Sequence, residues 1–201
     1  ENLSPKGQEY INVVRRNANR MVTFINQLLD FRKVQSGKMN LKIAYTDVLA
    51  LVKDIAAHFS EIANEKQIEL LISANVKELY AWIDSEKIDI VLYNLLSNAF
   101  KFTPSNKIIT IAIDNDLANG FFTISVVDQG IGVPTDKLND IFELYYEIDK
   151  APGNSLEGTG IGLALCKEIV GIHHGEIEAL NNIGEGLTVE VKLPSGIEKY
   201  K

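Results

Sequence analysis

The chain has 201 residues and a formal net charge of −7 at pH 7, with 46% hydrophobic and 23% charged residues. These proportions are ordinary for a globular protein, and the negative charge argues against nucleic-acid binding, which relies on clustered Lys and Arg. The single cysteine, Cys166, excludes an internal disulfide framework and a cysteine-rich metal site, and it is consistent with a reducing compartment.

No apolar run approaches the roughly 18 residues that a membrane span requires. The polar start of the chain, residues 1–4, does not resemble a signal peptide. We therefore expect this part of the protein to be cytoplasmic and free of membrane contact. That expectation is compatible with an inner-membrane anchor N-terminal to Glu1.

Residues 4–36 are expected to form one long helix. Ser4 before Pro5 is a favourable helix start, and Gly37 is a favourable stop. A seam with coiled-coil spacing runs along this helix: Ile11, Val14, Ala18, Met21, Ile25 and Leu28. A lone helix would expose this seam to water. The chain contains no second helix of matching pattern, so we expect association with another chain or with residues outside this sequence.

The rest of the chain alternates between strands and helices. Strands are expected at residues 39–43, 68–72, 80–83, 107–114, 121–127, 176–180 and 187–193, and helices at 46–65, 84–102 and about 161–173. A Gly-rich irregular stretch covers about 128–160. Three helices and a mixed sheet predict an α+β fold, a two-layer α/β sandwich with the helices on one face.

The helix at 84–102 carries a polar cluster beside its apolar face. At ~100° per residue, Asn94, Asn98 and Lys101 fall within about 60° of arc. An Asn oxygen is an acceptable ligand for Mg²⁺, and Lys offers a point charge to phosphate. For this helix alone, a solvated polar face is the alternative interpretation.

Asp128, Gly130 and Gly132 directly follow a predicted strand. An aspartate at a strand end can accept a hydrogen bond from an adenine amino group, and glycines allow a base to approach the backbone. Asp-x-Gly is also a common turn, so the motif alone leaves both interpretations open.

A second glycine-rich stretch, residues 157–163, precedes the last predicted helix. Glycines that end at a helix N-terminus expose backbone amides to phosphate. The stretch lacks the Gly-Lys-Ser/Thr of a Walker loop, and it follows a loop, unlike the dinucleotide fingerprint. A simple capping turn is the alternative.

Taken in order, these stretches resemble four boxes of the sensor histidine kinases of two-component systems. Residues 94–103 resemble the N box, 128–132 the first glycine box, 141–146 the F box and 158–163 the second glycine box. The resemblance spans about residues 40–195. It implies the Bergerat-type ATP-binding fold of the gyrase, Hsp90, histidine kinase and MutL superfamily. The first helix resembles the second helix of the dimerisation and histidine phosphotransfer domain, so the implied domains are 1–38 (incomplete) and 39–201, the ATP-binding catalytic domain.

The resemblance also implies roles for single residues. Asn98 would be the Mg²⁺ ligand, Asn94 and Lys101 would be catalytic contacts on the phosphate side, and Asp128 would fix the adenine amine. Residues 134–156 look like the mobile lid, in which Phe142 and Tyr146 would pin the lid or dock it on the bundle. The remaining implied nucleotide contacts are Phe102, Gly130, Gly132, Tyr146, Gly158, Thr159, Gly160, Gly162 and Leu163.

The chain departs from the family in its phospho-acceptor motif. None of the histidines, His58, His173 and His174, is followed by an acidic residue and Arg-Thr-Pro. A cap or core role is expected for His173 and His174, and a core role for Cys166. The helix that carries the acceptor would precede Glu1, or a partner protein would supply the histidine. We therefore expect the chain to bind ATP without phosphorylating itself.

The F box departs as well. Arginines that can reach the γ-phosphate are frequent around it in the family, whereas Leu144 and Glu147 occupy those positions here. Lys150 is the nearest cation, and whether it replaces a lid arginine is left open.

The implied function is a protein histidine kinase that uses Mg²⁺ and ATP to phosphorylate a histidine on a homodimeric helical bundle. The phosphoryl group would then pass to an aspartate of a response regulator. Three alternatives share the fold: an ATP-driven clamp, a serine kinase of the anti-sigma type, and a degenerate nucleotide-binding dimerisation module. The clamps activate water with a glutamate where this chain has Asn94, and the serine kinases normally lack the long first helix.

Overall fold

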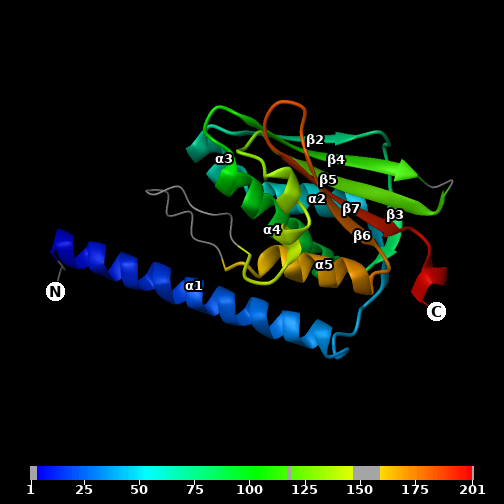
Figure 1. The fold of residues 1–201 in the computed structure, drawn as a ribbon, viewed down its shortest axis with the longest axis horizontal. Helices are drawn as coiled ribbons and strands as arrows, with labels where there is room; N and C mark the ends of the chain where they lie inside the picture. Colours follow the sequence, from blue (N-terminus) through cyan, green and yellow to red (C-terminus); the bar gives the residue numbers. More distant parts are fainter. Residues whose placement is uncertain (1–3, 117–118, 147–158, 201) are drawn as a thin grey trace.

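The computed structural model describes residues 4–116, 119–146 and 159–200, apart from the side chains of Pro5, Arg16 and Arg20. A long helix, α1 (Pro5–Gln35), leads into an α/β domain, as Figure 1 shows. Ser4 caps α1 by accepting a hydrogen bond from the N–H of Gly7 at 3.1 Å, and Gly37 has φ +66 just beyond its end. Both predicted ends of the first helix are therefore confirmed.

Five strands form the main sheet in the order β2-β4-β5-β7-β6, with β2 parallel to β4 and the other pairs antiparallel. Their bounds are β2 Glu69–Ala74, β4 Ile108–Asp116, β5 Phe121–Val127, β6 Glu176–Asn181 and β7 Leu187–Pro194. Two helices, α4 (Ser85–Phe102) and α5 (Gly162–Ile172), cover one face of the sheet (Figure 1). The expected two-layer α/β sandwich with a mixed sheet is confirmed.

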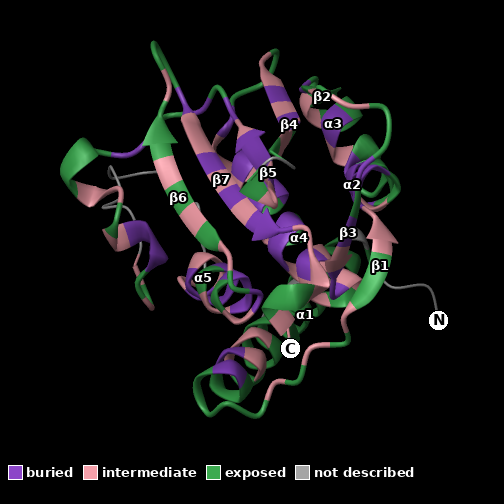
Figure 2. Cartoon of the chain, turned by 90° about the vertical axis from the view of Figure 1, so that its right-hand side faces the viewer, coloured by how far each residue is buried: buried purple, intermediate pink, exposed green. Residues whose placement is uncertain are grey.

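The core lies between this sheet and its helices. Alternate residues of β4 and β5 point into it, among them Ile109, Ile111 and Ile124, each at most 1% exposed. Figure 2 shows the same kind of alternation along β4 and β7 as bands of buried and intermediate residues. This alternation is the period-two pattern of a sheet with one buried face.

The predicted strand at 39–43 is wrong. The strand lies further along the chain, as β1 (Ala44–Asp47), and pairs antiparallel with β3 (Tyr80–Ile83) in a separate two-stranded sheet. The backbone N–H of Lys42 instead donates to Oδ2 of Asp84 at 2.7 Å. Lys42 therefore bonds to the N-cap residue of α4 and not to a neighbouring strand.

The single helix predicted at 46–65 is two helices, α2 (Val48–Ala57) and α3 (Ser60–Lys66). Asp47 caps the first by accepting from the N–H of Ala50, as a helix start near this residue predicted. The break falls at His58 and Phe59. Phe59 is buried and its ring stacks on that of Phe100, with centroids 5.4 Å apart, so a long-range packing contact accompanies the break.

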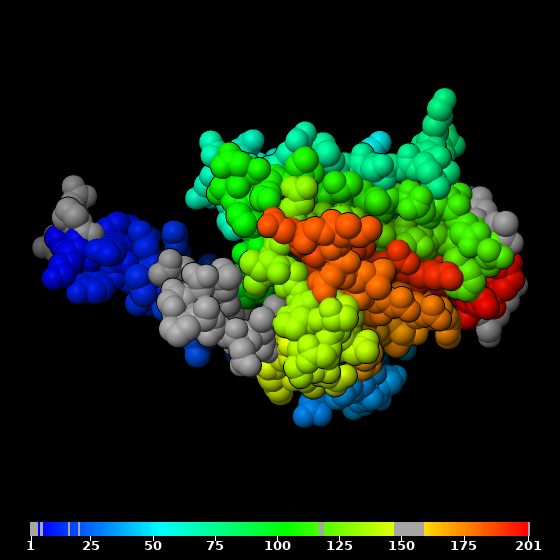
Figure 3. Space-filling view, turned by 45° about the horizontal axis from the view of Figure 1, so that its top comes forward, coloured from blue at the N-terminus to red at the C-terminus, as the bar shows by residue number. Residues whose placement is uncertain are grey.

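Helix α1 uses two opposite faces. Phe31 and Val34, 4% and 5% exposed, are buried against the α/β domain. At ~100° per residue Val34 lies across the helix from the predicted seam, and Phe31 lies beside the last seam residue, Leu28. The seam is exposed except for Leu28, which is half-buried against the core. Figure 3 shows the N-terminal half of α1, in blue, projecting beyond the domain. Docking of the C-terminal end of α1 therefore leaves the seam from Ile11 to Ile25 open.

Two irregular elements lie between β5 and α5, the short 3-10 helices η2 (Thr135–Lys137) and η3 (Asp140–Phe142). A third, η4 (Ile197–Tyr200), lies near the end of the chain. Among the described residues, no helix is long and apolar enough to cross a membrane.

Candidate functional site

On the polar face of α4, Asn94 lies against both α1 and α5. Asn94 is half-buried, and its Nδ2 donates to the carbonyl of Ile90 at 2.7 Å, which fixes its amide orientation. Asn98 is also half-buried, and its side chain makes no hydrogen bond to any residue that the structure describes. The Nζ of Lys101 lies 4.7 Å from the ring centroid of Phe102. The three predicted polar residues therefore share one face of the helix.

Asp128 is 8% exposed, at the end of β5. Its Oδ1 accepts the backbone N–H groups of Gly130, at 2.8 Å, and Leu187, at 3.1 Å. Burial raises the pKa of the Asp128 carboxyl, and the two backbone donors act in the opposite direction. Within the described ranges, Oδ2 has no hydrogen-bond donor, so it is the acceptor that a ligand amine could use.

Gly130 lies tightly against the end of α4. A Cβ there would stand 2.8 Å from the carbonyl oxygen of Phe102, so any larger residue would push the loop off the helix. Gly132 has φ +65, a conformation that side chains disfavour. Gly130 therefore brings the first glycine box against the end of the N-box helix, while Gly132 lies beside Asn181 and Gly186.

The start of α5 meets Asn94. A Cβ on Gly162 would lie 2.7 Å from Oδ1 of Asn94, and no side chain among the described residues caps the helix at Ile161. The hydroxyl of Thr159 accepts from the N–H of Ile161 at 3.3 Å. The N box and the second glycine box therefore converge at an uncapped helix N-terminus, a favourable place for an anion.

Tyr145 and Gly160 connect this corner to the F box. The N–H of Tyr145 donates to the carbonyl of Gly160 at 2.8 Å, and a Cβ on Gly160 would lie 2.6 Å from Cα of Tyr145. Phe142 is 6% exposed and packs in the core, while Tyr146 is half-buried against it. Leu144 and Leu163 are half-buried too. Gly158 and residues 147–156 of the predicted lid, among them Glu147 and Lys150, lie outside the described residues.

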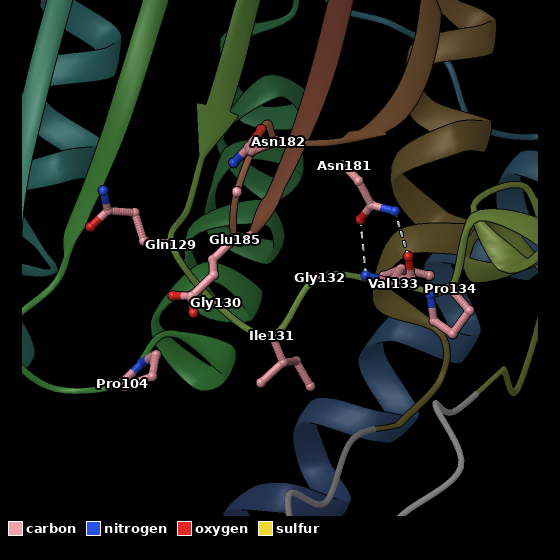
Figure 4. Close-up of a pocket in the computed structure, with 12 residues that line it drawn as sticks. Pro104, Gln129, Gly130, Ile131, Gly132, Val133, Pro134, Asn181, Asn182 and Glu185 are labelled. Carbon is pink, nitrogen blue, oxygen red and sulfur yellow. Dashed lines mark hydrogen bonds between the residues drawn. The ribbon is translucent and has the colours of Figure 1, made fainter.

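A pocket of about 620 Å³ lies beside the first glycine box, between residues 129–134 and the turn from β6 to β7 (Figure 4). Asn181 closes one side by accepting from the N–H of Val133 and donating to its carbonyl. The described residues that line this pocket include Gly130 and Gly132 but not Asn94, Asn98 or Asp128. The pocket therefore adjoins the first glycine box without including the polar residues of α4. The chemistry of those polar residues identifies the candidate site better than the pocket does.

Sequence reasoning missed Gln27 of α1. Its Nε2 donates to Oδ1 of Asn94 at 3.0 Å, and its Oε1 accepts from the hydroxyl of Thr159 at 2.9 Å. Gln27 lies one turn before Phe31 and two turns before Val34, so it is a polar residue on an apolar face of the helix. That position could have indicated that its side chain has a specific partner.

It also missed Asn182, which supports Asp128. Nδ2 of Asn182 donates to the carbonyl of Asp128 at 2.8 Å, and its Oδ1 accepts from the hydroxyl of Thr188 at 2.6 Å. The sequence contains no regular spacing that links these positions.

His173 and Cys166 have the core roles that the sequence predicted. His173 is fully buried, with Nδ1 2.8 Å from the carbonyl of Ile169 and Nε2 accepting from the N–H of Asp84. Burial lowers the pKa of His173 and raises that of the Cys166 thiol. His58, which falls inside the single helix expected at 46–65, is the exposed C-cap of α2.

Comparison with known proteins identifies the class. Residues 83–197 match the family described as histidine kinase-, DNA gyrase B-, and HSP90-like ATPase, and the chain belongs to this family. Its relatives include the sensor histidine kinases WalK of Bacillus subtilis (strain 168), 34% identical over 185 residues, and TmoS of Ectopseudomonas mendocina, 35% identical over 196 residues. These matches cover 92% and 95% of the chain but only 30% and 20% of the relatives. The expected resemblance to sensor histidine kinases is confirmed.

Solved structures share the fold. ShkA, solved at full length in complex with AMPPNP, has a TM-score of 0.83 and 23% identity, over 96% of this chain and 40% of that one. The Acinetobacter baumannii histidine kinase AdeS has a TM-score of 0.78 and 17% identity, over 98% of this chain and 87% of that one. The long helix followed by the α/β domain is thus an arrangement found in histidine kinases.

Proposed function

We propose that this chain is the Mg–ATP-binding catalytic core of a sensor histidine kinase, which transfers the γ-phosphoryl group of ATP to a histidine on a dimeric helical bundle. The observation that carries the proposal is the meeting of Asn94, Thr159 and Gly162 at the uncapped start of α5. Amide oxygens, a hydroxyl and a helix N-terminus together match a triphosphate and its cation.

The residues present fit Mg²⁺ bound between protein and phosphate. The described residues contain no cluster of three His, Cys, Asp or Glu side chains that could hold a metal alone. Asn98 offers an amide oxygen with no described partner, and Mg²⁺ commonly takes few protein ligands and several phosphate oxygens. Once bound, the ion would neutralise charge on the phosphates, while Asn98 and Lys101 hold them in position.

The adenine would bind at Asp128. Its Oδ1 is held by two backbone donors, which leaves Oδ2 for the exocyclic amine. Gly130 and Gly132 would form the adjacent wall, with Phe102, Leu163 and Tyr146 as apolar lining. Gly158 and Gly160 would complete the phosphate loop.

Transfer is favoured over hydrolysis because of Asn94. The clamp ATPases of this fold use a glutamate to activate water, as the sequence resemblance implies, whereas a carboxamide is not a base. Phosphoryl transfer needs positioning and charge neutralisation more than covalent chemistry from the protein, and the α4–α5 corner supplies both.

The acceptor and the partners are part of the proposal. The seam of α1 from Ile11 to Ile25 is exposed and could pack in a homodimeric bundle, since the C-terminal end of the helix docks on the α/β domain. We assign residues 1–38 to part of a dimerisation and phosphotransfer domain. The acceptor histidine would then lie on another helix of that domain, which is not in this sequence. A structure of the similar histidine kinase ThkA with the response regulator TrrA supports a response regulator as the final acceptor. We place the activity in the cytoplasm.

The kinase assignment is tested by labelling with [γ-³²P]ATP and Mg²⁺. The chain alone should acquire no acid-labile label. Addition of the purified dimerisation and phosphotransfer domain of WalK should give acid-labile, base-stable label on that domain. Release of inorganic phosphate at a high rate, with no label on the acceptor, would contradict the kinase assignment and favour the clamp ATPase.

A further inference from the structure

Gln27 bridges the two halves of the candidate phosphate site. Its amide nitrogen donates to Oδ1 of Asn94 at 3.0 Å, and its amide oxygen accepts from the hydroxyl of Thr159 at 2.9 Å. Asn94 belongs to α4 and Thr159 precedes α5, so a side chain of α1 joins both elements. Figure 1 shows α1 passing alongside α5 at this end of the domain.

The bridge belongs to a packed interface. Phe31 and Val34, one and two turns beyond Gln27, are buried in the core, and Leu28 packs against it half-buried. Gln27 itself is half-buried. Apolar anchors on the same face of the helix therefore hold its amide in place.

The atoms that Gln27 contacts are those that the phosphates need. Oδ1 of Asn94 is turned outward because Nδ2 is held by the carbonyl of Ile90. The hydroxyl hydrogen of Thr159 is directed to Gln27, since its oxygen accepts from Ile161. A phosphate oxygen that accepts from the Thr159 hydroxyl, or a cation or metal-bound water at Oδ1 of Asn94, would have to displace the Gln27 amide.

We propose that Gln27 is an internal competitor of the nucleotide phosphates, so that docking of α1 through Gln27 and occupation of the phosphate site exclude one another. The inference rests on the proposed ATP-binding function and adds a regulatory residue to it. Coupling between two binding events is reciprocal. Phosphate binding would therefore loosen α1, and a constraint that holds α1 against the domain would weaken nucleotide binding.

The geometry gives this coupling a route to the bundle. The seam of α1 from Ile11 to Ile25 lies on the side of the helix away from Gln27 and Val34. A partner helix that packs on the seam and phosphates that bind at Asn94 would therefore both affect the position of α1. Binding at one of these places would change affinity at the other by moving α1.

The test compares the wild-type chain with Gln27→Ala, Gln27→Asn and the control Asn26→Ala, a neighbouring exposed residue of α1. Calorimetry measures the affinity for AMPPNP with Mg²⁺ and, separately, for adenosine, which has no phosphates. We expect Gln27→Ala to bind AMPPNP about five- to tenfold more tightly, the effect of losing one or two competing hydrogen bonds. Gln27→Asn, too short to bridge both partners, should behave similarly. Adenosine affinity and the control should not change.

A second measurement uses the wild-type chain. Saturating AMPPNP should speed hydrogen exchange of the backbone amides in residues 24–35, while adenosine should not. Equal AMPPNP affinity in Gln27→Ala and the wild type, or unchanged exchange in α1, overturns the competitor role and leaves ATP binding intact. Weaker AMPPNP binding in Gln27→Ala overturns it too, since Gln27 would then assist the nucleotide. If no variant binds AMPPNP or adenosine, the proposed function fails as well.

Discussion

The backbone N–H of Asp84 donates to Nε2 of His173 at 3.3 Å. Asp84 is the N-cap of α4 and His173 the C-cap of α5, so the bond joins the two helices that carry the N box and the second glycine box. Asp84 also accepts from the N–H of Lys87 and, through Oδ2, from the N–H of Lys42 in the linker after α1. One buried junction therefore relates α4, α5 and the linker.

This junction predicts a loss of stability in mild acid. Burial lowers the pKa of His173 below its ordinary value near 6.5, and Lys87 and His174 act in the same direction, whereas the Ile169 carbonyl and Asp84 oppose them. The unfolded chain thus binds a proton at a higher pH than the folded one. The stability linked to neutral His173 is fully present above about pH 6.5 and falls as the pH drops through and below that value.

Urea unfolding at pH values between 8 and 5 measures this effect. His58→Ala removes an exposed histidine and should keep the same pH dependence. A free energy of unfolding that stays flat for the wild-type chain from pH 7 to pH 5 would contradict a buried neutral His173.

Asn98→Ala should remove the benefit of Mg²⁺ for nucleotide binding. The side chain has no described hydrogen-bond partner, so the free energy of unfolding should change by no more than about 0.5 kcal/mol. AMPPNP affinity measured with Mg²⁺ should fall toward the value measured without it. The exposed neighbour Ser97→Ala is the control, and a Mg²⁺ response equal to that of the wild type in Asn98→Ala would exclude the ligand role.

Asp128→Asn should reduce the preference for adenine over guanine. The asparagine oxygen can still accept from Gly130 and Leu187, while an NH₂ group replaces the Oδ2 acceptor. Loss of that acceptor should cost about 1–3 kcal/mol of discrimination. Competition of ATP and GTP for a bound fluorescent nucleotide measures the ratio. Asp114→Asn, on the exposed side of β4, is the control; intact discrimination in Asp128→Asn would place the adenine contact elsewhere.

Two glycines of α5 form a matched pair. Gly162→Ala would bring a Cβ to 2.7 Å from Oδ1 of Asn94, whereas nothing lies within 4 Å of a Cβ on Gly171. Gly171→Ala should stabilise the chain by about 0.5–1 kcal/mol through helix propensity. Gly162→Ala should displace Asn94 and weaken AMPPNP binding. Thermal unfolding and calorimetry separate the two effects, and equal nucleotide affinity in both variants would argue against a close contact between α5 and Asn94.

Features with local signals were predictable from the sequence. The Ser4-Pro5 start of α1, the helix expected at 84–102 and strand β3 at 80–83 all agree with the structure, because caps and apolar periodicity act over a few positions. The four boxes were found in order for the same reason, as each is a short stretch with its own residue pattern.

The features that were missed depend on distant contacts. The break between α2 and α3 places Phe59 on Phe100, and the segment after Met39 is held by Asp84 rather than by a strand partner. Gln27 meets Asn94 across the fold, and no periodicity in α1 specifies which element will cover its second face. Such pairings are set by tertiary packing, which overrides local pattern.

Calorimetric titration with AMPPNP, with and without Mg²⁺, is the measurement that decides whether the α4–α5 corner binds ATP. We expect micromolar binding that weakens without Mg²⁺ and is lost from the double variant Asn98→Ala, Asp128→Asn. Absence of binding at millimolar AMPPNP, in both the wild-type chain and Gln27→Ala, would contradict the assignment of the α4–α5 corner as an ATP site.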